Sequence, residues 1–357
     1  MINLDPWYVE NIVCPVDHSA LRVEGNFLVS ANGRHYAVVE GMPVMLRDDV
    51  KETIGVARTS LDLAVAIANG NGSGSAPLYV ETLGVTDKER QLACDLRQIG
   101  GDYDPVVAVM IGATSGFAYK HLIGVSASYP IPAFRFSTPQ PGQLLDIGCN
   151  WGRWTIAAAH AGHRAVGIDP QLGAVLAARR VAAQLGVSAR FIVGDARYLP
   201  FRPRAFDYAW SYSVLQHFAR SDARSSLAEI ERVMRPSGLT RIQMANRLGI
   251  RSLYHMARRR FQEPSGFDVR YWSPRELKAV FTEYLGATKL NADCFLGLGL
   301  QWSDFERMNS AAKSALVLSE ILRRSSEIVP PLRWFADSLF CTSTTRDENA
   351  IPSGSRM

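Results

Sequence analysis

The stretch that decides the fold is residues 143–159, which read QLLDIGCNWGRWTIAAA. A short apolar strand, residues 144–147, leads into a turn bounded by Gly148 and Gly152, and the turn leads into an alanine-rich helix. In such a strand–turn–helix unit, backbone N–H groups and the helix N-terminus can approach a ligand closely. Asn150 stands where a glycine is usual. We expect the turn to form nevertheless, because asparagine tolerates the left-handed backbone region.

Three more strand-like segments follow, and each ends in a polar residue. They are residues 165–168, 189–193 and 206–210, which end at Asp169, Asp195 and Ser211. Regular alternation of strands and helices from about 142 to 245 predicts a parallel α/β sheet, and such sheets bind ligands at the carboxyl ends of their strands. Asp169 comes about twenty residues after the turn, where a carboxylate accepts hydrogen bonds from ribose hydroxyls.

These segments, together with GDARYLPF at 194–201 and EIERVMRPSG at 229–238, resemble the successive motifs of class I S-adenosylmethionine-dependent methyltransferases. The resemblance is close over 142–245 and looser to about 343. It implies a Rossmann-like sheet of seven strands with a reversed last strand, and S-adenosyl-L-methionine as the cofactor. A nicotinamide dehydrogenase would share the turn and Asp169, but it lacks the two later motifs.

The resemblance also implies which residues contact the cofactor. The turn and the strand before it would line the methionine moiety, Asp169 would hold the ribose, and Asp195 would accept from the adenine amine. The complete predicted set is Asp146, Gly148, Cys149, Asn150, Gly152, Asp169, Asp195, Ala196 and Ser211.

The end of the fourth strand indicates the class of methyl acceptor. The family's DNA enzymes place Asn or Asp followed by Pro-Pro and an aromatic residue there, whereas this chain has SYSVLQH at 211–217. That segment resembles enzymes that act on small molecules, lipids, quinones and sugars, and we expect methylation at oxygen. His217 is the first candidate general base, since the pKa of histidine lies near neutrality, and Tyr212 is the second. The alternative is that His217 packs against the cofactor or caps the next helix.

A basic segment follows the predicted fifth strand, at 246–261. Arg247, Arg251 and Arg258 are spaced by four and seven residues, so they would share one face of a helix. With Tyr271 they are the predicted contacts to an anionic acceptor. The alternative is a solvated arginine face.

Residues 1–50 form a separate unit with strand-like runs at 26–30 and 35–39 around an Asn-Gly turn. The unit resembles the small zinc ribbon that activates several tRNA, rRNA and protein methyltransferases. Only Cys14 remains of the four cysteines of that family, so we expect no metal and predict that the ribbon docks on the methyltransferase domain of its own chain. Ribbons of this kind also occur in rRNA methyltransferases, which keeps RNA open as an alternative acceptor.

The remaining chain divides into a helical linker region at 51–135, a methyltransferase domain at 136–344 with a helical insertion near 303–324, and a flexible tail at 345–357. Of 357 residues, 47% are hydrophobic and 20% charged, which excludes a disordered or fibrous chain. No apolar run is long enough to span a membrane, and five scattered cysteines are typical of a reduced, cytoplasmic protein. A regulatory subunit that binds the cofactor without catalysis also fits the sequence. The sequence does not indicate the oligomeric state.

Overall fold

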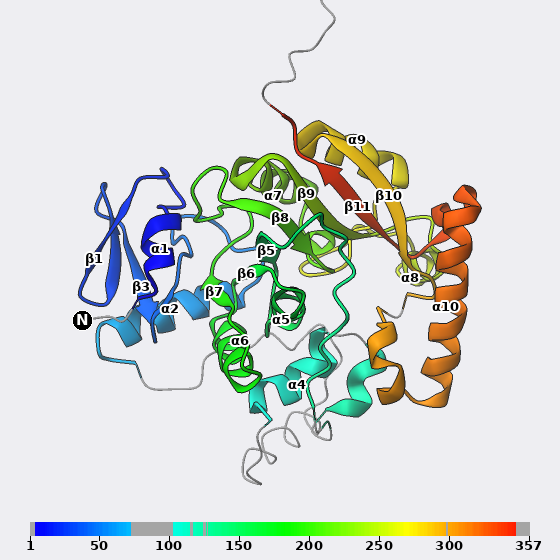
Figure 1. Cartoon of the computed structure of the whole chain (residues 1–357), viewed down its shortest axis with the longest axis horizontal. Coiled ribbons are helices and arrows are strands. Elements are labelled where there is room, and N and C mark those ends of the chain that lie inside the picture. Colours follow the sequence, from blue (N-terminus) through cyan, green and yellow to red (C-terminus); the bar gives the residue numbers. More distant parts are fainter. Residues whose placement is uncertain are drawn as a thin grey trace, which may run out of the picture.

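The computed structural model describes residues 4–72, 103–114, 117–123, 126, 128–297 and 299–347, and Figure 1 shows their arrangement. A seven-stranded sheet lies at the centre, and a four-stranded antiparallel sheet lies at the N-terminal end. The sequence pattern also predicts a helix at 87–99 and a Gly/Ser-rich linker at 69–77, and the helix, most of the linker and the end of the tail lie outside the described residues.

The central sheet has the strand order β10-β11-β9-β8-β5-β6-β7. Its strands are β5 (Gln143–Ile147), β6 (Arg164–Asp169), β7 (Arg190–Val193), β8 (Phe206–Ser211), β9 (Met234–Ala245), β10 (Ala287–Cys294) and β11 (Ser338–Thr344). β11 runs antiparallel to both of its neighbours, while β5 pairs parallel with β6 and β8. This confirms the predicted seven-stranded sheet with one reversed strand.

Helices cover both faces of the sheet because its strands present apolar side chains on both faces. On one face, Leu145 and Ile147 of β5 join a core with α7 (Arg220–Val233) and α9 (Pro274–Leu285). On the other face, Leu144 packs with Trp154 of α5, and α6 packs nearby. These two helices are α5 (Arg153–His160) and α6 (Leu172–Gln184). Other described helices of this part are α4 (Pro105–Thr114), α8 (Ile250–Arg258), α10 (Ser310–Ile328) and the short 3₁₀ turns η2 (Phe117–Leu122), η3 (Leu215–His217), η4 (Trp302–Arg307) and η5 (Pro330–Phe335).

The N-terminal unit contains the predicted hairpin. It consists of α1 (Pro6–Asn11), β1 (Leu21–Glu24), β2 (Phe27–Ser30), β3 (His35–Val39) and β4 (Met42–Pro43), followed by α2 (Val56–Ala68). The unit packs on β7, the edge strand of the central sheet: the Met45 backbone N–H donates to the Val193 carbonyl at 2.7 Å. The described residues contain no group of three His, Cys, Asp or Glu side chains that could hold a metal. The resemblance of the N-terminal unit to a zinc ribbon stays a prediction.

Two expectations about the C-terminal half have clear outcomes. The Ser273-Pro274 step predicts the N-cap and first residue of a helix, and Ser273 caps α9 in a full capping box with Glu276. The predicted arginine face is wrong, because α8 begins only at Ile250. Arg247 therefore precedes the helix and does not share a helical face with Arg251 and Arg258.

Candidate functional site

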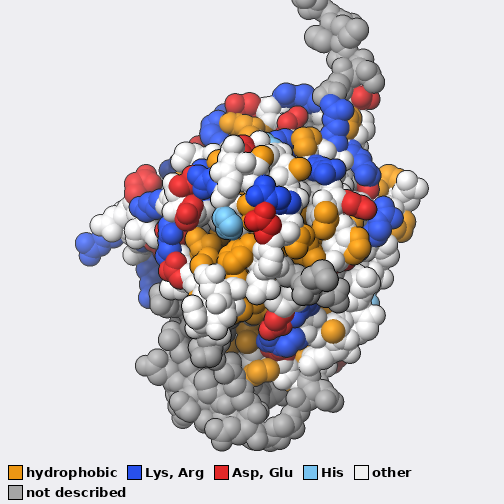
Figure 2. Space-filling view, turned by 90° about the vertical axis from the view of Figure 1, so that its left-hand side faces the viewer, with side chains coloured by type: hydrophobic (Ala, Val, Ile, Leu, Met, Phe, Trp, Pro, Cys, Tyr) orange, Lys and Arg blue, Asp and Glu red, His pale blue; other side chains and the backbone are white. Residues whose placement is uncertain are grey.

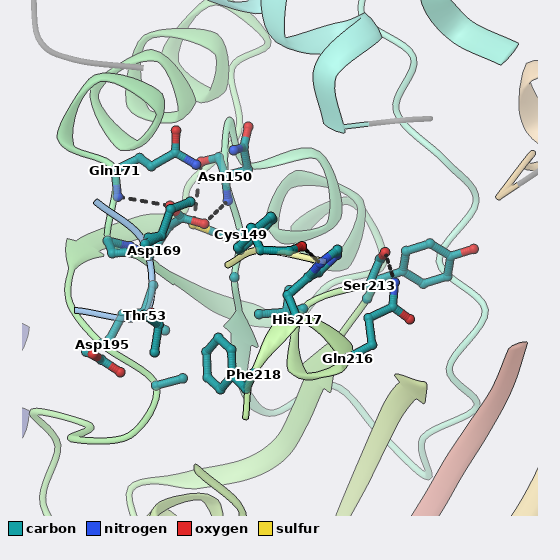
Figure 3. Close-up of a pocket in the computed structure, with 18 of the residues that line it drawn as sticks. Thr53, Cys149, Asn150, Asp169, Gln171, Asp195, Ser213, Gln216, His217 and Phe218 are labelled. Carbon is teal, nitrogen blue, oxygen red and sulfur yellow. Dashed lines mark hydrogen bonds between the residues drawn. The ribbon is translucent and has the colours of Figure 1, made fainter. Parts of the chain in front are cut away.

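A cavity of about 510 Å³ opens at the carboxyl ends of β5, β6, β7 and β8. From β5 the chain runs to β6 and β7 on one side, and β8 then returns to the other side of β5. Such a reversal of strand order leaves a crevice at the sheet edge, which is where open α/β sheets bind ligands. Figure 3 shows Asp169 and Asp195 on one side of the cavity, His217 and Phe218 in the middle, and Ser213 and Gln216 on the other side.

The turn after β5 brings its backbone close to the cavity. Gly148 has φ +76°, and a Cβ atom there would lie 2.2 Å from a methyl group of Val214, so only glycine fits. Asn150 has φ 47°, which confirms that asparagine takes the left-handed conformation in this turn. Its side-chain oxygen accepts from the Trp151 backbone N–H at 2.8 Å. The turn therefore presents backbone to a ligand with little side chain in the way.

Asp169 ends β6 and lies on the cavity wall. Its two carboxylate oxygens each accept one backbone N–H at 3.0 Å, from Asn150 and from Gln171. A carboxylate oxygen has two lone pairs, so each oxygen keeps one for a ligand hydroxyl. Burial raises the pKa of Asp169 to about 6, against the opposing effect of the two N–H donors. A vicinal diol, such as that of a ribose, fits this pair of acceptors.

Asp195 follows β7 and is held by Arg197. The Arg197 backbone N–H donates to one carboxylate oxygen at 2.8 Å, and the guanidinium donates to the other at 2.7 Å. These bonds fix the carboxylate at the cavity wall but use much of its capacity to accept. One further donor, such as an amine, can still be accommodated.

Three predicted cofactor residues lie behind the cavity wall. Asp146 is completely buried and accepts from the Thr155 hydroxyl at 2.6 Å, and its burial raises the pKa to about 7. Ser211 donates to the Ile147 carbonyl at 2.9 Å. Gly152 packs against α6 and β7 rather than the cavity. These residues support the turn from beneath, whereas Gly148, Cys149, Asn150 and Ala196 line the cavity together with Asp169 and Asp195.

His217 lines the cavity from η3. Its Nδ1 lies 2.7 Å from the Phe267 carbonyl oxygen, and its ring stacks on the Phe267 ring at 4.1 Å. A carbonyl can only accept, so Nδ1 carries the hydrogen and Nε2 keeps its lone pair. Burial lowers the pKa of His217 to about 4, so the imidazole is neutral near pH 7 and is a weaker base than a free histidine. The arrangement leaves Nε2 as the ring atom able to accept a proton.

Tyr212 also lines the cavity, but its hydroxyl is occupied. It donates to Asp293 at 3.1 Å and accepts from the Gln301 amide at 3.1 Å. Burial raises the pKa of the phenol well above its ordinary value. Tyr212 is therefore a poor proton acceptor near neutral pH and acts better as a fixed wall.

Ser213 is held in an unusual backbone conformation beside the cavity. Its φ is 62°, and its backbone N–H donates to the Gln243 side chain at 2.9 Å while its hydroxyl accepts from Gln216 at 2.8 Å. Non-glycine residues in this region are strained and concentrate at functional sites.

The structure does not bring the predicted acceptor residues to the cavity. Arg247, Arg251, Arg258 and Tyr271 are absent from its walls. The Arg251 guanidinium instead donates to the Leu296 carbonyl at 3.1 Å. The sequence segment that does reach the cavity is the loop after α8, through Phe267, Asp268 and Val269.

Several lining residues were not predicted, and most of them are apolar. They include Thr53, Ile54, Trp151, Trp154, Phe218 and Phe267. The two tryptophans lie in the quoted turn and helix, where their size alone could have marked them. No sequence signal indicates that residues before α2 reach a cavity formed by strands more than 90 residues later. The wall they form suits a partly apolar ligand next to the polar end at Asp169.

Comparison with known proteins identifies the central segment. Residues 144–238 match the family described as methyltransferase domain. The chain is 27% identical over 154 residues to malonyl-[acyl-carrier protein] O-methyltransferase of Serratia marcescens, covering 43% of this chain and 52% of that protein. It is 30% identical over 105 residues to ubiquinone biosynthesis O-methyltransferase of Azorhizobium caulinodans, covering 29% and 41%.

The chain thus aligns with about half, or less, of the length of these relatives. A solved structure, phosphoethanolamine N-methyltransferase 2 of Haemonchus contortus in complex with S-adenosyl-L-methionine, is 18% identical with a TM-score of 0.42, covering 65% of this chain and 56% of that one. The matched family and the named relatives agree with the strand–turn–helix unit and the acidic strand ends. Residues 144–238 are thus similar to a methyltransferase domain, and two relatives of the chain are named as methyltransferases.

Proposed function

We propose that the protein transfers a methyl group from S-adenosylmethionine to an oxygen atom of a small-molecule, lipid or glycan acceptor. The observation that carries the proposal is Asp169, a buried carboxylate at the end of β6 with one free lone pair on each oxygen, beside the close-approach turn at Gly148. Asp169 would hold the ribose, the turn the methionine moiety, and Asp195 the adenine amine. When bound, the cofactor would supply an electrophilic methyl group.

The other end of the cavity supports transfer to oxygen. Methyl transfer needs an acceptor held in line, water kept out, and a proton removed from a hydroxyl. Trp154, Phe218 and Phe267 would exclude water from the acceptor. The Nε2 atom of His217 would take the hydroxyl proton, with its tautomer fixed by the Phe267 carbonyl.

The comparisons support oxygen as the methylated atom only through the names of the relatives, two of which are O-methyltransferases that act on different molecules. The acceptor is therefore proposed as a class. The apolar walls favour a partly hydrophobic molecule over a highly charged one.

The test uses the full chain with methyl-labelled S-adenosylmethionine and a fractionated cell extract. We expect label in the small-molecule, lipid or glycan fraction, lost in His217→Gln and kept in His160→Gln, an exposed histidine at the end of α5. Label found only in RNA would replace the proposal with the RNA alternative. Cofactor binding without label in any fraction would indicate a non-catalytic subunit.

A further inference from the structure

The outward face of α8 is apolar, which reverses the usual arrangement of a surface helix. Ile250 is 62% exposed and Tyr254 is 59% exposed, and Leu253 lies exposed between them along the chain. Phe261, just after the helix, is 64% exposed. Only Ser252 and Met256 of α8 are buried against the protein. At 100° per residue, Ile250, Leu253 and Tyr254 fall within one third of the helix circumference and form a continuous apolar strip.

Arginines flank this strip with no acidic residue among them. Residues 246–262 contain five arginines and neither aspartate nor glutamate. Arg258 and Arg260 are exposed and form no ion pair with any residue that the structure describes. On the helix, Arg251 and Arg258 lie at the border of the apolar strip. The result is an apolar surface with a basic edge.

Among the described helices, α10 offers a comparison. α10 also exposes aliphatic side chains, Leu318 and Ile321, but its arginines are neutralised: Arg323 pairs with Glu320 at 2.8 Å and with Glu327 at 2.6 Å. Figure 2 shows a face on which acidic and basic side chains are interspersed around exposed hydrophobic ones. The described part of α8 therefore differs from α10 in having basic charge without ion-pair partners, at Arg258 and Arg260, beside an apolar strip.

We propose that α8 docks on the surface of a bilayer that contains anionic lipids. An interfacial helix buries an apolar face at the boundary of head groups and acyl chains, and its basic residues contact anionic head groups. α8 has nine residues, about 14 Å, and would lie in the plane of the interface. None of the helices in the described ranges is long and apolar enough to cross a membrane.

The geometry links the docking face to the cavity. The chain leaves α8 at Arg258 and reaches the cavity wall nine residues later, at Phe267. Arg259 lies 3.7 Å from Asp268, which fixes the connecting loop against the cavity wall. Docking through α8 would hold the cavity near the bilayer, where an apolar acceptor dissolves.

The aliphatic strip distinguishes a bilayer from RNA. Arginines and aromatic rings also suit single-stranded nucleic acid, through phosphate contacts and base stacking. The aliphatic side chains of Ile250 and Leu253 can neither contact phosphate nor stack on a base. At the boundary of head groups and acyl chains, the same side chains would be removed from water. The combined composition favours a lipid surface.

The test is co-sedimentation of the full chain with vesicles, without cofactor or acceptor, so that it is independent of the proposed methyl transfer. One set is phosphatidylcholine alone, and the other contains about a third phosphatidylglycerol. We expect binding to the anionic vesicles and little to the neutral ones. The double variant Ile250→Ser/Leu253→Ser should weaken binding at least about tenfold. Arg258→Ser/Arg260→Ser should weaken it about fivefold for each arginine removed.

The matched control is Leu318→Ser/Ile321→Ser, which removes two exposed aliphatic side chains from α10 and should bind like the wild type. All variants change exposed side chains, and an unchanged thermal midpoint checks that they fold. No binding to anionic vesicles, or an equal loss in the α10 control, would overturn the proposal. Binding of polyuridine that anionic vesicles do not compete away would also overturn it, in favour of nucleic acid.

Discussion

Replacing Asp169 with alanine should weaken the binding of S-adenosylmethionine while leaving the fold intact. The carboxylate already satisfies the backbone N–H groups of Asn150 and Gln171, and its remaining lone pairs face the cavity. Alanine removes both acceptors for the ribose hydroxyls. Water can enter the space and satisfy the two backbone donors, which limits the cost to the fold.

The magnitude follows from the charge of the acceptor. Hydrogen bonds to a charged group contribute about 1.5–3 kcal/mol. Water replaces part of the two ribose bonds, so we expect a total loss of about that size, which is roughly a 10- to 150-fold rise in Kd. Since burial raises the pKa of Asp169 to about 6, the free carboxyl becomes protonated below that pH. Wild-type affinity should therefore fall between about pH 7 and 5, and the alanine variant should lose most of this pH dependence.

Isothermal titration calorimetry measures both effects, and Asp62→Ala is the matched control. Asp62 is exposed on α2 and does not line the cavity. Its variant should bind the cofactor within about twofold of the wild type. An Asp169→Ala variant that binds as tightly as wild type, or an equal loss in both variants, would refute the assignment of Asp169 to the ribose.

Other predictions concern the proton acceptor, two buried acids and metal. His217→Gln should lower kcat at least about 100-fold with cofactor Kd unchanged, because general bases contribute on that scale; an unaltered kcat would exclude this role. Asp146 has its pKa raised to about 7 by burial, so folding binds protons and wild-type stability falls as pH rises from 4 toward 7. The thermal midpoint of Asp146→Asn minus that of wild type should thus increase from pH 5 to pH 8, and a constant difference would contradict the shift. Asp304→Asn breaks a buried ion pair with Arg153 and should destabilise the fold by about 3–5 kcal/mol in denaturant titrations. Residues 1–50 should need no metal, so a chelator should not move the midpoint, and about one zinc per chain in elemental analysis would overturn this.

The parts of the fold that were predictable are those fixed by local chemistry. The strand–turn–helix unit at Gly148 and the acidic end of β6 follow from short-range patterns, and so does the N-cap at Ser273. The parallel pairing of β5, β6 and β7 places their polar carboxyl ends together at one edge of the sheet. Sequence order alone therefore brought Asp169 and Asp195 to one cavity.

The misplaced arginines show the limit of spacing arguments. Spacings of four and seven place Arg247, Arg251 and Arg258 on one face only if the helix includes all three, and α8 starts at Ile250. The position of each guanidinium group then depends on tertiary contacts. The Arg251 guanidinium donates a hydrogen bond to the Leu296 carbonyl, 45 residues later in the chain. Neither the start of the helix nor this contact is visible in the local sequence.

The residues before α2 show a second limit. Thr53 and Ile54 reach the cavity because the N-terminal sheet packs along β7 through Val44 and Met45. Docking of one unit on the edge of another depends on two surfaces that are far apart in sequence. The in-cis docking was predicted from a resemblance, but its contribution to the cavity was not.

The most direct test of the account is the position of the cofactor in a crystal structure of the protein with S-adenosylhomocysteine. We predict the ribose hydroxyls within hydrogen-bond distance of the Asp169 carboxylate, the adenine beside Asp195, and the sulfur facing the part of the cavity lined by His217. A cofactor bound elsewhere, or a ribose that does not touch Asp169, would contradict the central claim.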